Sequence, residues 1–168
     1  MSWYNGSGNP VEFEEIIKLV KMHGENGGTI YIGTDSHMKR GRCAFGTAIC
    51  LLGLTDGVKN QYFVIRKNAQ AKSYSTLLQR ITDEVQRSVD LGLRLLEDCP
   101  KVNIELHLDI SPEGLDEKTS KFSKMLVGYA KGSGFDCKIK PEAFAASSVA
   151  DKHSKVIIKG KNNENKGN

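Results

Sequence analysis

The chain has 168 residues, of which 39% are hydrophobic and 26% are charged, and its formal net charge is +4 at pH 7. These values are typical of one globular domain and exclude a coiled coil or a repeat array. No apolar run approaches the roughly 20 residues of a membrane span, and no secretory signal is recognisable, so a cytoplasmic protein without membrane association is expected.

The first part of the chain predicts one helix and three antiparallel strands. Residues 1–10 are rich in glycine, serine and asparagine and are expected to be a flexible N-terminus, with Asn9 as the N-cap and Pro10 as the first residue of a helix that ends near His23. Alternating or continuous apolar patterns then predict strands at residues 29–34, 43–54 and 61–66, joined by glycine-containing turns. Together they predict an antiparallel meander.

The second part alternates between helices and strands. The strongest helical pattern covers residues 75–97 and stops before Pro100, and a strand at 102–110, a helix at 116–131, a strand at 135–140 and a helix at 148–158 follow. Residues 159–168 are expected to be a disordered polar tail. Because strand-helix-strand crossovers run parallel, the pattern predicts one α/β domain at residues 11–158, with a mixed five-stranded sheet flanked by helices.

Two of the predicted strands place an aspartate at their carboxyl end. Asp35 lies in IGTDSH and Asp109 lies in IELHLDIS. Ligands of open α/β sheets bind at such ends, and two aspartates there would repel each other unless a cation such as Mg²⁺ or Mn²⁺ lay between them. The alternative is that each aspartate supports a turn.

Two further acids are candidates for the same site. On a helical wheel Glu84 lies closest to the buried face of its helix, whereas the other acids lie on the solvent side; the alternative is a surface pair with Arg80 or Arg87. Asp151 is surrounded by cationic side chains, which suits an anionic substrate. Its alternative role is structural, in a capping box that starts at Ser148 and in an ion pair with Lys155.

At these residues the sequence resembles the ribonuclease H-like fold, and more closely the YkuK-like family of predicted ribonuclease H-related nucleases. The resemblance covers about residues 28–156. It is carried by IGTDSH at 32–37, RITDE at 80–84, IELHLDIS at 104–111 and KIKPEAFAASSVADKHSK at 138–155. It implies a nuclease centre in which four carboxylates hold two divalent metal ions, Mg²⁺ or Mn²⁺, and which transfers here onto Asp35, Glu84, Asp109 and Asp151.

Such a centre hydrolyses phosphodiester bonds in nucleic acid, with Asp35 expected to bridge the two ions. The basic C-terminal part of the chain fits this partner, since residues 118–161 contain ten lysines against three acids. The candidates for substrate binding are Lys140, Lys152, His153 and Lys155. The alternative is that these lysines form solvated helix faces. DNA, RNA and hybrid remain equally open, and no obligate protein partner is indicated.

Two histidines leave a further metal ligand open. His37 and His107 each stand two residues from an aspartate, on one strand face if the strand continues regularly, and such pairs could bind Zn²⁺ or Mn²⁺; the alternative for His107 is a hydrogen-bonded histidine at the sheet surface. Two other classes of function compete with the nuclease. One is a nucleic-acid-binding protein that does not cut, and the other is a phosphohydrolase that acts on small molecules from a closed pocket.

Overall fold

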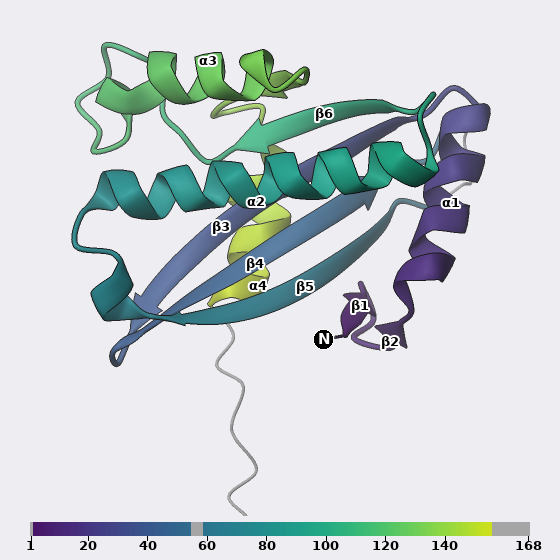
Figure 1. Ribbon diagram of the computed structural model, residues 1–168, viewed down its shortest axis with the longest axis horizontal. Helices are drawn as coiled ribbons and strands as arrows, with labels where there is room; N and C mark the ends of the chain where they lie inside the picture. Colours follow the sequence, from purple (N-terminus) through teal and green to yellow (C-terminus); the bar gives the residue numbers. More distant parts are fainter. Residues whose placement is uncertain (1, 55–58, 156–168) are drawn as a thin grey trace, which may run out of the picture.

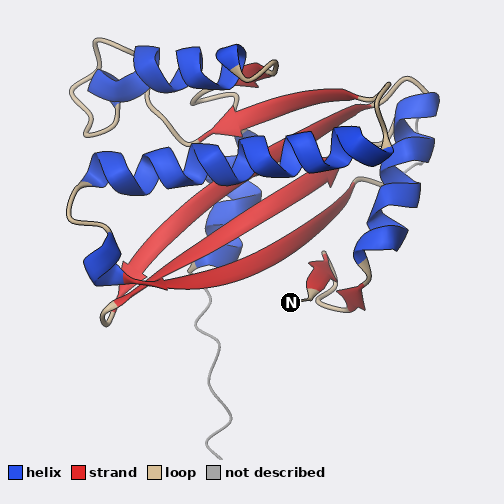
Figure 2. Cartoon of the chain, in the orientation of Figure 1, coloured by secondary structure: helices blue, strands red, loops and turns tan. Residues whose placement is uncertain are grey.

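The computed structural model of the protein describes residues 2–54 and 59–155 and shows a twisted sheet with helices on both faces (Figures 1 and 2). The strands lie in the order β2-β1-β5-β4-β3-β6-β7. Their bounds are Trp3–Asn5 (β1), Pro10–Val11 (β2), Thr29–Lys39 (β3), Arg42–Leu51 (β4), Gln61–Gln70 (β5), Asn103–Leu108 (β6) and Asp136–Lys138 (β7). The helices are Phe13–Glu25 (α1), Leu77–Asp98 (α2), Ser123–Gly132 (α3) and Asp151–Ser154 (α4), with a π-helix at Ala145–Ala150 (η3) and 3₁₀ turns at Ala71–Ser73 (η1) and Ser120–Phe122 (η2).

The α/β class is confirmed, but the sheet has seven strands in the described residues, so the expectation of five is wrong. Five of the seven are those that the sequence predicts: β3, β4 and β5 form the antiparallel meander, and β6 and β7 run parallel to β3. The two additional strands are β2 and β1, which extend the sheet beyond β5. The central architecture therefore follows the hydrophobic pattern, and the sheet is wider at its N-terminal edge.

Strands β1 and β2 form where the sequence predicts a flexible N-terminus and the first residue of a helix. Residues 3–5 and 10–11 pair in the sheet where flexible chain is expected, because Trp3 is buried and stacks on the Phe13 ring at 5.7 Å between centroids. Pro10 belongs to β2 and is not the first helical residue; α1 begins at Phe13, and its N-cap is Glu12. The start of the chain is thus held by pairing of β1 with β5 and by the aromatic contact of Trp3 with α1.

Other elements differ from the prediction mainly at their ends. Strand β3 continues to Lys39 and β5 to Gln70, because a regular ladder with β4 extends through polar residues at this end of the sheet. Helix α3 begins at Ser123 and not near residue 116, and the segment before it contains only turns and η2. The last helical segment begins at Ala145, before Ser148. The predicted helix end at 156–158, the turn at 55–57 and the polar tail at 159–168 lie wholly or mostly outside the described residues.

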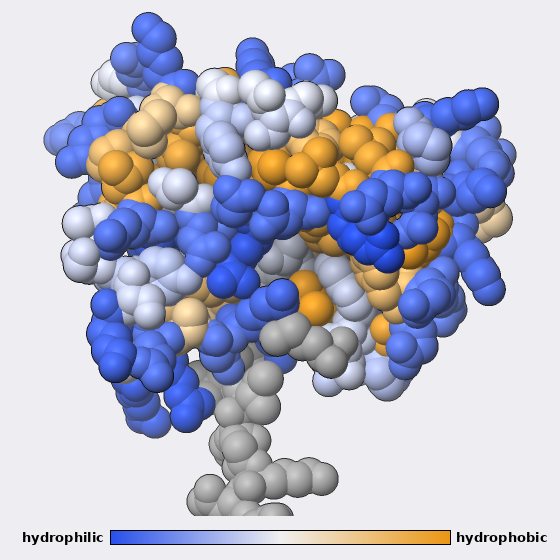
Figure 3. Space-filling model, in the orientation of Figure 1, coloured by the Kyte–Doolittle hydropathy of each residue, from blue (hydrophilic) through white to orange (hydrophobic). Residues whose placement is uncertain are grey.

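The two faces of the sheet are covered differently (Figure 1). Helices α1, α2 and α3 pack on one face over a core that includes Ile30, Ile32 and Leu106, and a smaller cluster with Ala48 and Val64 lies under η3 on the other. Figure 3 shows hydrophilic residues along α2 on the first face, with hydrophobic residues exposed between α2 and α3. None of the helices in the described ranges is both long and apolar enough to cross a membrane.

Two glycines allow the segment η3–α4 to lie directly on the sheet. A Cβ atom on Gly33 would lie 2.3 Å from the backbone nitrogen of Ala146, and one on Gly46 would lie 2.8 Å from the carbonyl oxygen of Ala150. Side chains at these positions would hold the segment away from the strands. The close approach brings the start of α4 next to the middle of β3, where Asp35 lies.

Candidate active site

Asp35 and Asp109 come from neighbouring parallel strands. The last registered pair of β3 and β6 is Thr34 with Leu108, so the two aspartates occupy the next position on each chain. The expectation that Asp35 ends its strand is wrong, because β3 continues to Lys39 in pairing with β4. The carboxyl end that matters belongs to β6, which stops at Leu108 and leaves β3 without its parallel neighbour beside Asp35.

Asp35 is a buried carboxyl group close to other acids. Only 7% of the residue is exposed, and the Ser154 hydroxyl donates a hydrogen bond of 2.8 Å to its Oδ2 atom. Burial, together with weaker repulsion from Asp109 and Asp151, raises the pKa of Asp35 to about 7 against the lowering effect of the Ser154 hydrogen bond. Three of the four predicted acids therefore act on one another electrostatically.

Glu84 joins this group from the other face of the sheet. It is 6% exposed on α2, and the Ser36 hydroxyl donates a 2.5 Å hydrogen bond to its Oε1 atom. Burial raises the pKa of Glu84 to about 8, with added repulsion from Asp35 and Asp109. The surface pair with Arg87 is not formed, since Arg87 pairs with Asp83 at 3.1 Å between Nε and Oδ1.

Lysines neutralise the other two acids. The Nζ atom of Lys140 lies 3.1 Å from Asp109 Oδ1, although this buried oxygen has no hydrogen bond of good geometry in the described structure. The Nζ atom of Lys155 lies 2.6 Å from Asp151 Oδ1, which confirms the predicted helical pair. The pKa of Lys155 is raised mainly by Asp151, and Asp35 and Asp109 contribute. The predicted capping box is wrong, because Ser148 lies inside η3 and caps nothing.

The donor chemistry of the cluster fits a hard divalent cation. The donor atoms are carboxylate oxygens, and the carboxyl groups of Asp35 and Glu84 have raised pKa values. In the described structure Asp109 Oδ1 is buried without a hydrogen bond of good geometry. Within the described ranges, however, no three His, Cys, Asp or Glu side chains are grouped closely enough to hold an ion. Lysine ammonium groups balance part of the charge that such ions would balance.

His107 has a structural role in this arrangement. Its ring is buried between Tyr31 and Phe144, its Nδ1 accepts a 3.2 Å hydrogen bond from the Ala145 backbone amide, and its Nε2 lies 3.0 Å from Glu105 Oε1. Both ring nitrogens are therefore engaged, which matches the alternative of an ordinary hydrogen-bonded histidine. His37 lies two residues beyond Asp35 on the same face of β3 and is half-buried.

His153 points toward β5 and away from the acids. The Arg66 guanidinium lies 3.0 Å from its Nδ1, and the Tyr62 hydroxyl lies 3.3 Å from its Nε2. Burial, with repulsion from Arg66 and Lys152, lowers the pKa of His153, so its ring is neutral at pH 7. Lys152 is exposed beside it.

Sequence reasoning missed four polar side chains that support the site. Ser36 and Ser154 donate to Glu84 and Asp35, and Arg66 and Tyr62 hold His153. Ser36 could have been suspected, because it follows Asp35 directly. The other three could not, since only tertiary contacts bring them to this place.

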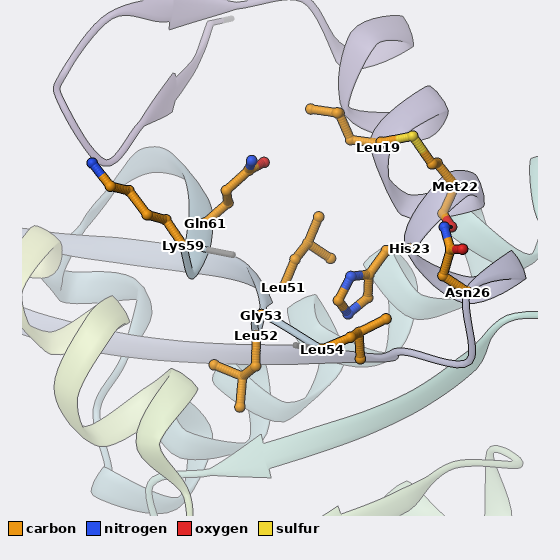
Figure 4. A pocket seen from close by; sticks show the side chains of 10 residues that line it. All are labelled: Leu19, Met22, His23, Asn26, Leu51, Leu52, Gly53, Leu54, Lys59 and Gln61. Carbon is orange, nitrogen blue, oxygen red and sulfur yellow. Dashed lines mark hydrogen bonds between the residues drawn. The ribbon is translucent and has the colours of Figure 1, made fainter. Parts of the chain in front are cut away.

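The pocket in Figure 4 lies elsewhere. Side chains from α1 and from the end of β4 line it, including Met22, His23 and Leu51, and none of the four acids is among its lining residues. The same is true of the pockets beside α2 and beside β1. None of these pockets gives the acids the closed cavity that a small-molecule phosphohydrolase requires.

The fold and the site together define an α/β protein with an acidic cluster at the end of a parallel strand pair. The chain belongs to the ribonuclease H-like family, because the model of that family, described as Ribonuclease H-like, matches residues 12–155. It is also similar to the uncharacterized protein YkuK of Bacillus subtilis (strain 168), with 23% identity over 91% of this chain and 96% of the relative. No solved structure matches it. The resemblance to a YkuK-like, ribonuclease H-like family is thereby confirmed, and the family indicates a nuclease-type fold.

Proposed function

We propose that this protein is a divalent-metal-dependent nuclease that hydrolyses phosphodiester bonds, with Asp35, Glu84, Asp109 and Asp151 as its catalytic carboxylates. One observation carries the proposal. Acids from four separate segments lie close enough together for their mutual repulsion to add to burial in raising the pKa values of Asp35 and Glu84. A cluster of this kind is unfavourable for folding, and cations remove that cost, so the arrangement indicates a cation-binding function.

The four acids would hold two ions, Mg²⁺ or Mn²⁺. Asp35 is the candidate bridging ligand because it is influenced by both Asp109 and Asp151; Glu84 and Asp109 would complete one set of ligands and Asp151 the other. When bound, such ions supply Lewis-acid stabilisation of charge at the phosphate. Ser154 and Ser36 hold Asp35 and Glu84 in fixed orientations, which reduces the reorganisation that binding requires.

The lysines at the site have two kinds of partner, the acids of the cluster and the phosphates of a substrate. Lys140 and Lys155 are at least one third exposed at their side chains, and each now pairs with one of the acids. With cations bound at Asp109 and Asp151, Lys140 and Lys155 would lose these partners, and their ammonium groups would be available to phosphate oxygens. Lys152, exposed on α4, extends this cationic rim, whereas the neutral His153 ring on the same helix contacts Arg66 and Tyr62 of β5.

Substitution of Asp35 by asparagine tests the proposal. Asparagine keeps the hydrogen-bond acceptor for Ser154 but removes the negative charge, so we expect the fold to persist and metal-dependent cleavage to fall by at least about a hundredfold. Labelled DNA, RNA and hybrid substrates are incubated with and without Mn²⁺. Asp136→Asn, which removes an exposed acid on β7, is the matched control and should cleave normally. Full activity in Asp35→Asn would overturn the proposal.

The lysine pairs favour a second candidate, a nucleic-acid-binding protein on the same fold that does not cut. With Lys140 and Lys155 bound to Asp109 and Asp151, the cluster is partly neutralised without any metal. This candidate predicts nucleic-acid binding by the wild-type protein but no Mn²⁺- or Mg²⁺-dependent turnover on any of the three substrates. The cleavage assay therefore separates the two functions directly.

A further inference from the structure

A second basic segment of the chain lies outside the lysine-rich C-terminal part. Residues 36–82 contain eight lysines and arginines and only one acid, Asp56, for a net charge of +7. Four of the eight are exposed around the turn between β3 and β4: Lys39, Arg40, Arg42 and Lys72. Lys72 lies there because the Ala71 backbone amide donates a 3.0 Å hydrogen bond to the carbonyl of Gly41.

This end of the sheet shares a face with Asp35. Side chains alternate along a strand, so Lys39 points to the same side of β3 as Asp35, and its cross-strand partner Arg42 does too. Arg66 is on that side as well, since the ladder pairs Asp35 with Gly46 and Gly46 with Arg66. Segment η3–α4 covers the middle of this face at Gly46, and in Figure 1 the strands extend well beyond α4 toward the β3–β4 turn.

Arg66 is held in place without being neutralised. Its guanidinium donates to Nδ1 of His153, and a histidine nitrogen that accepts from arginine belongs to a neutral ring. No carboxylate lies within 4.0 Å of Arg66 in the described ranges, whereas Arg87 and Arg94 on α2 each pair with an acid. A fixed guanidinium without a counter-charge is suited to an anion that comes from outside the chain.

Arg40 occupies a backbone conformation that arginine disfavours. Its φ angle is 51°, and Gly41 follows with a φ of 76°. Turns with two such residues strongly prefer Asn-Gly, and a side chain as large as arginine is uncommon in the first position. The basic side chain is thus kept at the tip of the hairpin against the local backbone preference.

We propose that the basic hairpin surface, defined as Lys39, Arg40, Arg42 and Arg66, binds the sugar-phosphate backbone of a nucleic-acid strand and leads that strand to the acidic cluster. The surface carries four positive charges, and the acid on this face of these strands is Asp35 itself. Arg66 lies two strands from Asp35, a backbone separation of about 10 Å, so a strand bound along the surface reaches both places. The inference rests on the proposed function for the identity of the partner.

Binding measured without metal ions tests the surface. Fluorescein-labelled single-stranded DNA, single-stranded RNA and an RNA–DNA hybrid of one sequence are titrated in EDTA, and Kd is followed by anisotropy over a range of salt concentrations. For the double variant Arg42→Gln and Arg66→Gln, we expect binding at least about tenfold weaker and a salt slope reduced by about two. The control Arg94→Gln removes an arginine that pairs with Glu97 on α2, and it should bind as the wild type does.

Arg40→Asn provides a variant whose folding is not in doubt, because asparagine suits the left-handed conformation. We expect a higher urea midpoint of unfolding together with weaker nucleic-acid binding and a salt slope reduced by about one. Wild-type Kd and slope in both this variant and the double variant would overturn the proposed surface. Equal losses in Arg94→Gln would also overturn it, since the attraction would then come from overall charge.

The failure of this inference differs from the failure of the proposed nuclease function. If the surface is wrong, Asp35→Asn still abolishes cleavage while the arginine variants bind normally in EDTA. If the nuclease function is wrong, no metal-dependent cleavage occurs, yet binding in EDTA still depends on Arg42 and Arg66. The two experiments use different variants and different readouts, so each conclusion stands or falls separately.

Discussion

Asp35 and Glu84 are carboxyl groups whose charged forms the fold disfavours. Burial is the main cause in both cases; repulsion from Asp109 and Asp151 adds to it at Asp35, and repulsion from Asp35 and Asp109 adds to it at Glu84. At pH 5 to 6 an unfolded chain carries both groups mostly ionised, whereas the folded chain retains their protons. The folded state therefore binds more protons, and these two groups reduce stability as the pH rises from about 4 to about 8.

We expect Asp35→Asn to remove its share of this cost. In metal-free buffer the variant should be more stable than the wild type by about 4 kcal/mol at pH 8 and by about 2 kcal/mol at pH 5, because the wild-type carboxyl ionises above pH 4 in the unfolded chain but keeps its proton in the fold up to a pKa of about 7. Urea unfolding at both pH values measures the difference. Asp136→Asn, at an exposed position, should show no such pH-dependent gain, and an equal effect of the two substitutions would contradict this interpretation.

The acids of the site could be predicted from the sequence more readily than the side chains that hydrogen-bond or pair with them. Strand ends indicated Asp35 and Asp109, and the helical wheel placed Glu84 toward the buried face, because each signal depends on neighbours in the chain. The Ser154 hydroxyl at Asp35 and the Lys140 ammonium at Asp109 depend on contacts between residues far apart in sequence. Such contacts leave no periodic pattern.

At the scale of elements, the segment η3–α4 depends on two glycines of the sheet. Gly33→Ala and Gly46→Ala each place a Cβ within 3.0 Å of backbone atoms in that segment, and backbone cannot rotate away as a side chain can. We expect each substitution to destabilise the fold by about 1–3 kcal/mol and, because Ser154 and Asp151 shift with the segment, to reduce cleavage as well. Urea unfolding and the cleavage assay measure the two effects.

Gly128→Ala is the matched control for these substitutions. Gly128 lies in α3 with nothing within 4 Å of a new Cβ, so alanine there should stabilise the fold by about 0.5–1 kcal/mol. Destabilisation by Gly128→Ala, or tolerance of alanine at both Gly33 and Gly46, would show that close packing of η3–α4 on the sheet does not control the site.

The same scale shows where sequence patterns stop. The five central strands were predictable because their apolar runs are long, but β1 and β2 have three residues or fewer and no periodicity to detect. The ends of β3 and β5 extend through polar residues such as Lys39 and Asn68. Each of these residues pairs with a residue of β4 because the ladder continues, and not because its side chain is buried. These polar strand ends contribute to the basic hairpin surface. Their charged side chains lack the apolar pattern that predicts a strand, and the same side chains make this end of the sheet a candidate for binding.

Across the whole molecule, charge alternates in long blocks along the chain. Residues 36–82 have a net charge of +7, residues 83–117 have ten acids against three basic residues, and residues 118–161 again reach +7. The fold brings Asp35 from residues 1–35, Glu84 and Asp109 from residues 83–117 and Asp151 from residues 118–161 into one cluster. Basic residues from both positively charged blocks lie beside it. Such an arrangement attracts a polyanion while leaving a local place for cations.

A cation that binds this cluster should stabilise the whole fold, since it binds the folded chain and not the unfolded one. With Mn²⁺ at about ten times its Kd the expected gain is about 1.4 kcal/mol, which corresponds to a rise of about 3–6 °C in Tm for a domain of this size. Differential scanning calorimetry with and without Mn²⁺ measures the rise in the wild type. Asp136→Asn should show the same rise, and Asp35→Asn should show little or none because it lacks the candidate bridging carboxylate. An unchanged Tm in the wild type at millimolar Mn²⁺, or an equal rise in Asp35→Asn, would mean that the acids do not bind metal together, and the non-cutting nucleic-acid-binding protein would then be the better description.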